Sequence, residues 1–277
     1  MSDRCIQLID RRVLILSGEE RKSFLQGLIT NDVNKIAPER WLYAGLLTPQ
    51  GKYLYDFFIT EVDDALLLDC SEVHLTELKR KLMMYKLRSK VEISDSDNTI
   101  FAHLDDTPEA WQDPRHPAMG SRRLDGTPTA DIAAYLSHRL AHGIPDGPAD
   151  FLQDKTLWLE TNADLLNGVD FEKGCYVGQE LTARMRYRGK VRRRLIPVQA
   201  KADIPPGTPI KFGEREIGDV RSTNGQKALA NLKVEDISKA PLMAGDVSLT
   251  PWLPDWLEAT VIKSQEEADN GKKKEAV

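Results

Sequence analysis

The chain is poor in cysteine. Three cysteines, Cys5, Cys70 and Cys175, are spread over 277 residues and form no C-x-x-C pair. So few thiols cannot form a disulfide framework, a permanent structural zinc site or a four-cysteine cluster. A metal role for Cys175 would therefore have to be transient, shared with a partner or completed by a ligand.

Long hydrophobic runs and targeting segments are also lacking. No apolar stretch approaches the roughly 18 residues of a membrane span, and residues 1–12 contain no apolar signal core. We therefore predict a cytoplasmic location and no membrane partner. The net charge of -5 gives no overall basic character, so nucleic acid is not the expected partner. No glycine-rich phosphate loop is present.

The composition is that of an ordinary globular protein, with 41% hydrophobic and 29% charged residues. Apolar residues alternate over 41–47, 53–62 and 65–69, which predicts strands, and recur at helical spacing over 75–85. Strands and helices in this order indicate a mixed α+β fold. After Arg194, short strands separated by glycine and proline predict a small β-barrel.

These patterns divide the chain into four parts. Residues 1–104 are predicted to form an N-terminal α+β lobe, and residues 105–194 a second α+β lobe that carries Cys175. Residues 195–262 are predicted to form the barrel. Residues 263–277 are charged and poor in apolar side chains, so a disordered tail is expected.

The most informative segment surrounds Cys175, in the order Lys173-Gly174-Cys175-Tyr176-Val177-Gly178-Gln179-Glu180. Glycine lets the backbone approach a ligand closely, and a cation such as Lys173 favours thiolate over thiol. Most unpaired cysteines are small buried hydrophobic residues, which is our interpretation of Cys5 and Cys70. For Cys175 a reactive thiol is an equal alternative, with Lys173 beside it in the catalytic group.

A basic run follows the cysteine segment. Its charged members alternate, so on a strand they would share one face; they are Arg184, Arg186, Arg188, Lys190 and Arg192. A solvated strand face is the simplest interpretation. The charge density also suits an anionic partner, which would be a polyanionic cofactor tail, RNA or an acidic protein.

Three segments resemble one known family. The segment from Lys173 to Gly189, the stretch 24–33 (FLQGLITNDV) and the stretch 46–52 (LLTPQGK) resemble the YgfZ-type folate-binding proteins. These are relatives of the glycine-cleavage T-protein that act in iron–sulfur cluster maturation. The resemblance covers most of the chain to about residue 235.

The resemblance implies a T-protein-like fold, with two α+β lobes and a C-terminal barrel around a central cavity. It implies tetrahydrofolate as the cofactor and Cys175 as the functional thiol, with no permanent metal. The expected partners are iron–sulfur client enzymes, including tRNA-modifying enzymes, and cluster carrier proteins. The expected folate contacts are Asn31, Asp56, Glu160, Gln179, Glu180, Arg184, Arg186 and Arg188.

An assembly factor is favoured over an enzyme, but other functions stay open. The first is a folate-dependent one-carbon transferase. The T-protein hairpin carries two adjacent aspartates, whereas this chain has Tyr55-Asp56, so one acid is missing. The second is an RNA- or protein-binding module that uses the basic run. A cysteine hydrolase is least favoured, because it requires a histidine close to Cys175.

Overall fold

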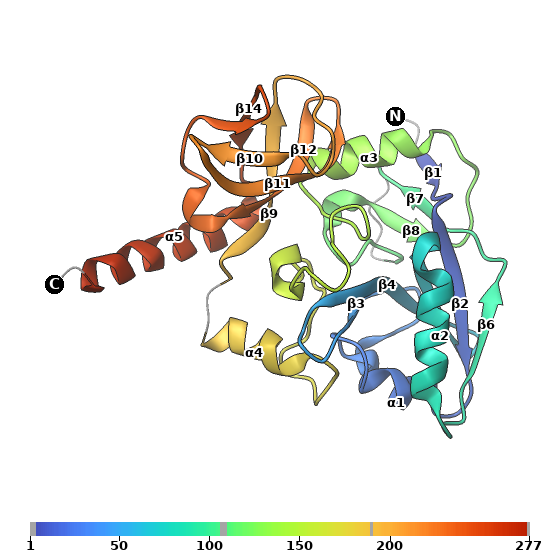
Figure 1. Cartoon of the computed structure of the whole chain (residues 1–277). Coiled ribbons are helices and arrows are strands. Elements are labelled where there is room, and N and C mark those ends of the chain that lie inside the picture. Colours follow the sequence, from blue (N-terminus) through green and yellow to red (C-terminus); the bar gives the residue numbers. More distant parts are fainter. Residues whose placement is uncertain (1–3, 106–109, 189–190, 276–277) are drawn as a thin grey trace.

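A computed structural model describes residues 4–105, 110–188 and 191–275, with side chains described as far as residue 265. Figure 1 shows a lobe built on a five-stranded sheet, a second lobe built on a three-stranded sheet, and a barrel that carries a long C-terminal helix. In the described part of the chain, no helix has both the length and the apolar character needed to cross a bilayer.

The first lobe contains an antiparallel sheet in the order β3-β4-β5-β2-β6. Its strands are β2 (Arg11–Ser17), β3 (Leu42–Leu47), β4 (Tyr53–Val62), β5 (Ala65–Ser71) and β6 (Glu92–Ser96). Side chains of a strand alternate between the two faces. Phe57 and Ile59 of β4 therefore enter one core, and Asp56 and Phe58 face the other.

Helices cover the first of these faces. Leu25 of α1 (Arg21–Gln26) and Leu78 and Leu82 of α2 (Leu75–Lys86) are fully buried there. Short 3-10 helices flank them, η1 (Val33–Lys35) after α1 and η2 (Glu72–His74) before α2. The helical spacing of the α2 leucines, which predicted this helix, is what places them on one buried face.

The second lobe packs against the other face of the sheet. Its strands, in the order β1-β7-β8, are β1 (Cys5–Gln7), β7 (Phe101–His103) and β8 (Ser121–Arg123). Its helices are η3 (Pro117–Met119), α3 (Ile132–Ala141), η4 (Trp158–Thr161) and α4 (Gln179–Tyr187). Trp158 is 1% exposed and stacks on Tyr53 of β4 at a ring distance of 6.2 Å, so the two lobes share a core.

The barrel is closed by six strands in the order β10-β11-β12-β9-β14-β13. They are β9 (Arg193–Ala200), β10 (Pro209–Phe212), β11 (Arg215–Asn224), β12 (Lys227–Lys233), β13 (Leu242–Ala244) and β14 (Val247–Pro251). The 3-10 helix η5 (Val234–Asp236) follows β12. The predicted α+β class and the predicted barrel are confirmed.

The end of the chain differs from expectation. Helix α5 (Asp255–Glu275) occupies most of the segment for which a disordered tail is predicted, and it projects away from the barrel (Figure 1). Glutamate and lysine are poor core residues, which favours disorder, but together with alanine they are good helix formers. The predicted boundary at 262/263 lies inside this helix, and the boundary at 194/195 lies inside β9.

Candidate functional site

Cys175 lies at the tip of a loop that precedes α4. Cys5 and Cys70 are buried, as predicted, whereas Cys175 is exposed. Gly174 is also exposed, but Lys173 and Tyr176 on either side are buried at 7% and 8% exposure. Two anchored residues therefore hold a two-residue tip in solvent, and the thiol is accessible without any unfolding of the loop.

Lys173 is an anchor of this loop. Its Nζ donates hydrogen bonds to the carbonyl oxygens of Gln26 (2.9 Å), Ile29 (2.7 Å) and Asn31 (2.7 Å). Burial lowers the pKa of Lys173 to about 8. A lysine ammonium has three hydrogens, and all three are engaged. These contacts fasten the cysteine loop to the end of α1 and the residues after it. They indicate a structural role for Lys173, and not the catalytic role that we expected.

The hairpin turn between β3 and β4 supports the same loop. Gly178 has a left-handed φ of 85°, and a Cβ there would lie 2.5 Å from the carbonyl oxygen of Thr48. Gly51 of the turn has a φ of 72°, and a Cβ there would lie 3.1 Å from the carbonyl oxygen of Gly178. Only glycine tolerates both the conformation and the approach. The three segments that carry the family resemblance thus meet around Cys175.

The basic run after the loop is helical, so the predicted strand is wrong there. Helix α4 extends to Tyr187, and on a helix residues two apart do not share a face. Arg184 pairs with Glu180 at 2.8 Å, whereas Arg186 lies over the Phe171 ring at 5.2 Å. Gly189 and Lys190 lie outside the described residues. The alternating charges favour a strand, but Glu180 and Arg184 have the i,i+4 spacing of a helical pair, which is the signal for a helix.

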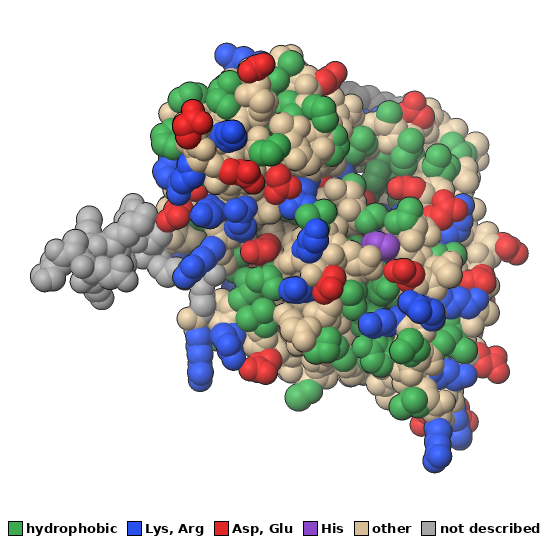
Figure 2. All heavy atoms as spheres, in the orientation of Figure 1, with side chains coloured by type: hydrophobic (Ala, Val, Ile, Leu, Met, Phe, Trp, Pro, Cys, Tyr) green, Lys and Arg blue, Asp and Glu red, His purple; other side chains and the backbone are tan. Residues whose placement is uncertain are grey.

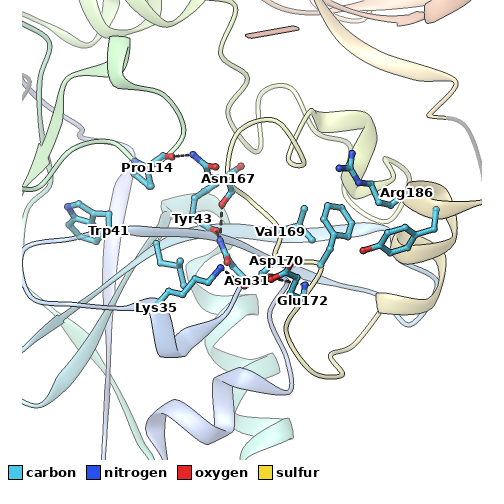
Figure 3. A pocket seen from close by; sticks show the side chains of 13 residues that line it. Asn31, Lys35, Trp41, Tyr43, Pro114, Asn167, Val169, Asp170, Glu172 and Arg186 are labelled. Atoms are coloured by element: carbon cyan, nitrogen blue, oxygen red, sulfur yellow. Dashed lines mark hydrogen bonds and ion pairs between the residues drawn. The ribbon is translucent and has the colours of Figure 1, made fainter. Parts of the chain in front are cut away.

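A cavity of about 570 Å³ lies beside the cysteine loop. Its aromatic lining residues are Trp41, Tyr43, Phe171 and Tyr187. Its polar and charged lining residues include Asn31, Lys35, Asn167, Asp170, Glu172 and Arg186. Figure 3 shows these side chains coming from β3 and the residue before it, from the loop after α1, from the segment before α4 and from α4 itself. The volume lies within the range of small-molecule sites.

Two of the expected folate contacts line this cavity, Asn31 and Arg186. The Asn31 amide is already engaged, because it donates to the carbonyl oxygens of Tyr43 (2.9 Å) and Asn167 (2.8 Å) and accepts from the Asp32 amide (2.9 Å). Asn31 therefore shapes the wall and has no donor left for a ligand. Arg186 lies over the Phe171 ring, and among the residues that the structure describes it forms no ion pair, so its charge is available to a ligand.

Two carboxylates in the lining were not among the expected contacts. Asp170 is ion-paired with Lys35 at 2.7 Å. Burial acts to raise the pKa of Asp170, but the Lys35 pair and two backbone amides outweigh it and hold that pKa below its usual range. The exposed Glu172 carboxylate forms no ion pair within the described part of the chain. No motif in the sequence distinguishes Glu172 from other surface acids, since only the fold brings it to the cavity.

Asp56 lies deeper, in a polar cluster between the two lobes. It is 1% exposed and accepts hydrogen bonds from the hydroxyls of Tyr53 (2.8 Å) and Tyr43 (3.2 Å). A Cβ at Gly147 would lie 2.1 Å from its Oδ1, so the backbone closes over the carboxylate. Burial, reinforced by the negative charge of Asp146, raises the pKa of Asp56. Tyr43, which lines the cavity, separates Asp56 from it.

The other expected contacts do not line the cavity either. Glu160 accepts from the Leu157 amide at 3.2 Å and thereby caps η4. Gln179 and Glu180 begin α4, Arg184 pairs with Glu180, and Arg188 lies just beyond the helix and is exposed. Among the described residues, no group of three histidine, cysteine or acidic side chains is arranged to hold a metal ion. Cys175 therefore offers a single ligand.

Comparisons with known proteins identify the barrel as a separate unit and show the family of the whole chain. The family model "CAF17, C-terminal beta-barrel domain" matches residues 192–259, which is the barrel. The iron–sulfur cluster assembly factor IBA57 of Mus musculus is 33% identical over 91% of this chain and 85% of its own length. The chain belongs to the IBA57 family of iron–sulfur cluster assembly factors.

Other members of the IBA57 family agree. The human protein is 32% identical over 91% of this chain and 85% of its own length. The homologue of Mycosarcoma maydis is 36% identical over 72% of this chain, which spans 58% of the length of that relative. The YgfZ-type resemblance was thus to close relatives, and the family itself is IBA57.

A solved structure shows the fold. This chain is similar in structure to the glycine cleavage system aminomethyltransferase T of Bartonella henselae, with a TM-score of 0.72 and 13% sequence identity. The match covers 92% of this chain and 86% of the Bartonella chain. The predicted T-protein-like fold is confirmed. The predicted cytoplasmic location is contradicted, because the three IBA57 relatives are named as mitochondrial proteins.

Proposed function

We propose that this chain assists the assembly of iron–sulfur clusters and that Cys175 is the thiol that takes up the cargo. The observation that carries the proposal is the exposed tip of Gly174 and Cys175, held between buried Lys173 and Tyr176. Membership of the IBA57 family supports the role in assembly. Neither of the other two cysteines is accessible.

The chemistry follows from a single accessible ligand. When the Cys175 thiol binds iron it loses its proton, and a sulfur–iron bond forms. A four-coordinate iron needs further ligands, which must come from the rest of the cluster and from a partner. A single ligand on a supported tip suits brief uptake and release, since the cargo is not enclosed by this chain.

The partners follow from the surface beside the tip. Arg184, Arg186 and Arg188 are exposed on α4 and just after it, next to the loop that carries Cys175. We propose that cluster carriers and client enzymes, tRNA-modifying enzymes among them, approach this side with acidic residues. Complementary charge of this kind raises association rates and orients partners.

We also propose that the cavity binds tetrahydrofolate. The support is its volume of about 570 Å³, its four aromatic rings and the free carboxylate of Glu172. A carboxylate can accept two parallel hydrogen bonds from an aminopyrimidine, so we propose Glu172, and not the expected contact Glu160, as the residue that binds the pterin. Arg186 would attract the glutamate tail. Bound folate would supply a one-carbon carrier close to Cys175.

Anaerobic calorimetric titration with tetrahydrofolate tests the cavity. We expect micromolar binding, about -8 kcal/mol, which Arg186→Gln weakens by about tenfold or more because a charged hydrogen bond is lost. Arg184→Gln is the matched control, since Arg184 carries the same charge on the same helix but does not line the cavity. No binding, or equal weakening by both variants, would remove folate from the proposal.

Cluster uptake is tested separately. The protein is incubated anaerobically with ferric iron, sulfide and glutathione, which can supply the missing thiolates, and charge-transfer absorption is recorded after desalting. We expect bound cluster in the natural chain and in Arg186→Gln, and none in Cys175→Ser. Cluster retained by Cys175→Ser would exclude Cys175 as the ligand, whatever the folate titration shows.

A folate-dependent transferase has no supporting observation. Such an enzyme needs a carboxylate beside the attacking amine. Asp56, the hairpin candidate, is enclosed by Tyr43, Tyr53 and Gly147.

A further inference from the structure

Helix α2 is apolar on both of its sides. Its inner side chains Leu78 and Leu82 are fully buried, yet Met83 is 50% exposed, Met84 is 66% exposed, and Leu87, one residue beyond the helix, is 86% exposed. A surface helix ordinarily turns polar residues to solvent. The packing of this chain therefore gives no reason for the exposed methionines and leucine.

Two of these side chains share one side of α2 with Arg80. Met83 and Met84 follow Arg80 by three and four residues, which places all three on one side of the helix, and Leu87 comes directly after the last helical residue. Leu87 has a φ of 46° and a ψ of -107°, a backbone conformation that is disfavoured for leucine. We call these four residues, together with Arg88, the α2 outer face.

The α2 outer face is also the centre of a basic region. Residues 75–90 contain one acidic residue, Glu77, and six basic residues: Lys79, Arg80, Lys81, Lys86, Arg88 and Lys90. Lys79 pairs with Asp95 and Lys90 with Glu19, and within the described chain the other four form no ion pair. This concentration of positive charge stands in a chain of net charge -5. Figure 2 shows Lys and Arg side chains next to hydrophobic ones over this part of the molecule.

We propose that the α2 outer face docks the protein on an anionic phospholipid surface. Interfacial helices bury apolar side chains at the level of the headgroups while lysine and arginine remain beside the phosphates. Methionine and leucine are unbranched at Cβ and adapt to such an environment. The charge is complementary to that of an anionic surface, and the apolar side chains are exposed where such a surface can cover them. The absence of apolar runs, from which we predicted no membrane partner, concerns helices that span a bilayer and not surface contact.

Co-sedimentation of the full chain with vesicles tests the proposal. We expect binding to vesicles of phosphatidylcholine mixed with phosphatidylglycerol, and none to phosphatidylcholine alone. Binding should weaken as salt is raised to about 1 M, where the screening length falls to about 3 Å. Equal binding to both kinds of vesicle, or no binding to either, would overturn the proposal; an acidic protein would then be the occupant left to consider.

Paired variants separate the two contributions. Arg80→Glu with Arg88→Glu should reduce vesicle binding at least tenfold, since each basic residue near an anionic surface contributes about fivefold. Met84→Gln with Leu87→Gln, which leaves all charges in place, should reduce it by about tenfold through lost apolar burial. Circular dichroism melting checks that each variant is folded.

The matched control changes the same net charge elsewhere. Lys201 and Lys211 are exposed on the barrel, and their double replacement by glutamate should leave vesicle binding within about twofold, because distant charges are screened. A loss in this control as large as in the α2 variants would show that only net charge matters, and would refute docking through α2.

Discussion

Lys173 provides the sharpest test of how the cysteine loop is held. Lys173→Met keeps most of the apolar stem but removes the ammonium, whose Nζ lies over the Tyr176 ring at 5.1 Å from the ring centre. The same ammonium bonds to the carbonyls of Gln26, Ile29 and Asn31. All three carbonyls then lose a partner, although the shape of the side chain is nearly unchanged.

The size of the effect follows from two opposing terms. A hydrogen bond to a charged group contributes about 1.5–3 kcal/mol, so three contribute about 4.5–9 kcal/mol before costs. Burying an ammonium costs several kcal/mol, consistent with the lowered pKa of Lys173, about 8. We therefore expect Lys173→Met to reduce the free energy of unfolding by about 2–4 kcal/mol.

Urea unfolding followed by circular dichroism measures this loss, and iodoacetamide alkylation of Cys175 reports on the loop itself. Lys35→Met is the control, because Lys35 also lies beside the cavity but is 61% exposed and forms an ion pair with the buried Asp170. With one partner in solvent, this pair should contribute about 1 kcal/mol, less than the buried ammonium of Lys173. The reasoning is refuted if Lys173→Met costs no more than Lys35→Met and leaves the alkylation rate unchanged.

Two further predictions concern the hairpin and the buried acid. Gly178→Ala should cost about 2–4 kcal/mol in urea unfolding, since it combines a left-handed φ with a Cβ 2.5 Å from a carbonyl oxygen; Gly174→Ala, which meets no atom within 4 Å, is the control, and equal costs would contradict the close approach. Because burial raises the pKa of Asp56, the folded protein keeps a proton that the unfolded chain releases near pH 4, so the contribution of Asp56 to stability should fall as pH rises above about 4. Asp56→Asn should remove this contribution and change the pH dependence of unfolding accordingly, and an unchanged pH dependence would show that Asp56 does not carry the proton.

The local patterns of the sequence predicted much of the fold. The alternation in 53–62 and the leucine spacing of α2 are each a direct consequence of burying one face, so strand and helix could be predicted without knowledge of the rest. The barrel was predicted from short apolar runs separated by glycine and proline. These elements needed no information about distant contacts.

The incorrect predictions arose where one pattern had two physical readings. Alternating arginines after residue 183 suit a strand face, but the same residues lie in a helix with an i,i+4 pair between Glu180 and Arg184. A charged segment poor in apolar residues suits disorder, but its glutamates and lysines are also helix formers, and it forms α5.

The site was predicted in its centre but not in its surroundings. Cys175 could be singled out because glycines and a lysine stand next to it in the sequence. Other features depend on contacts between segments that are distant in the sequence. Lys173 bonds to three carbonyls, Asp56 is buried, and Glu172 lines the cavity only because the fold brings these segments together. No local pattern carries that information.

The central claim is that function depends on the sulfur of Cys175 and not on its packing. The direct measurement compares Cys175→Ala with the natural chain in cells that lack their own copy of this protein, by iron–sulfur enzyme activities and by melting of the purified variant. Because Cys175 is exposed, stability should change by less than about 0.5 kcal/mol, while the enzyme activities should not be restored. Restored activities, or a variant that fails to fold, would contradict the claim.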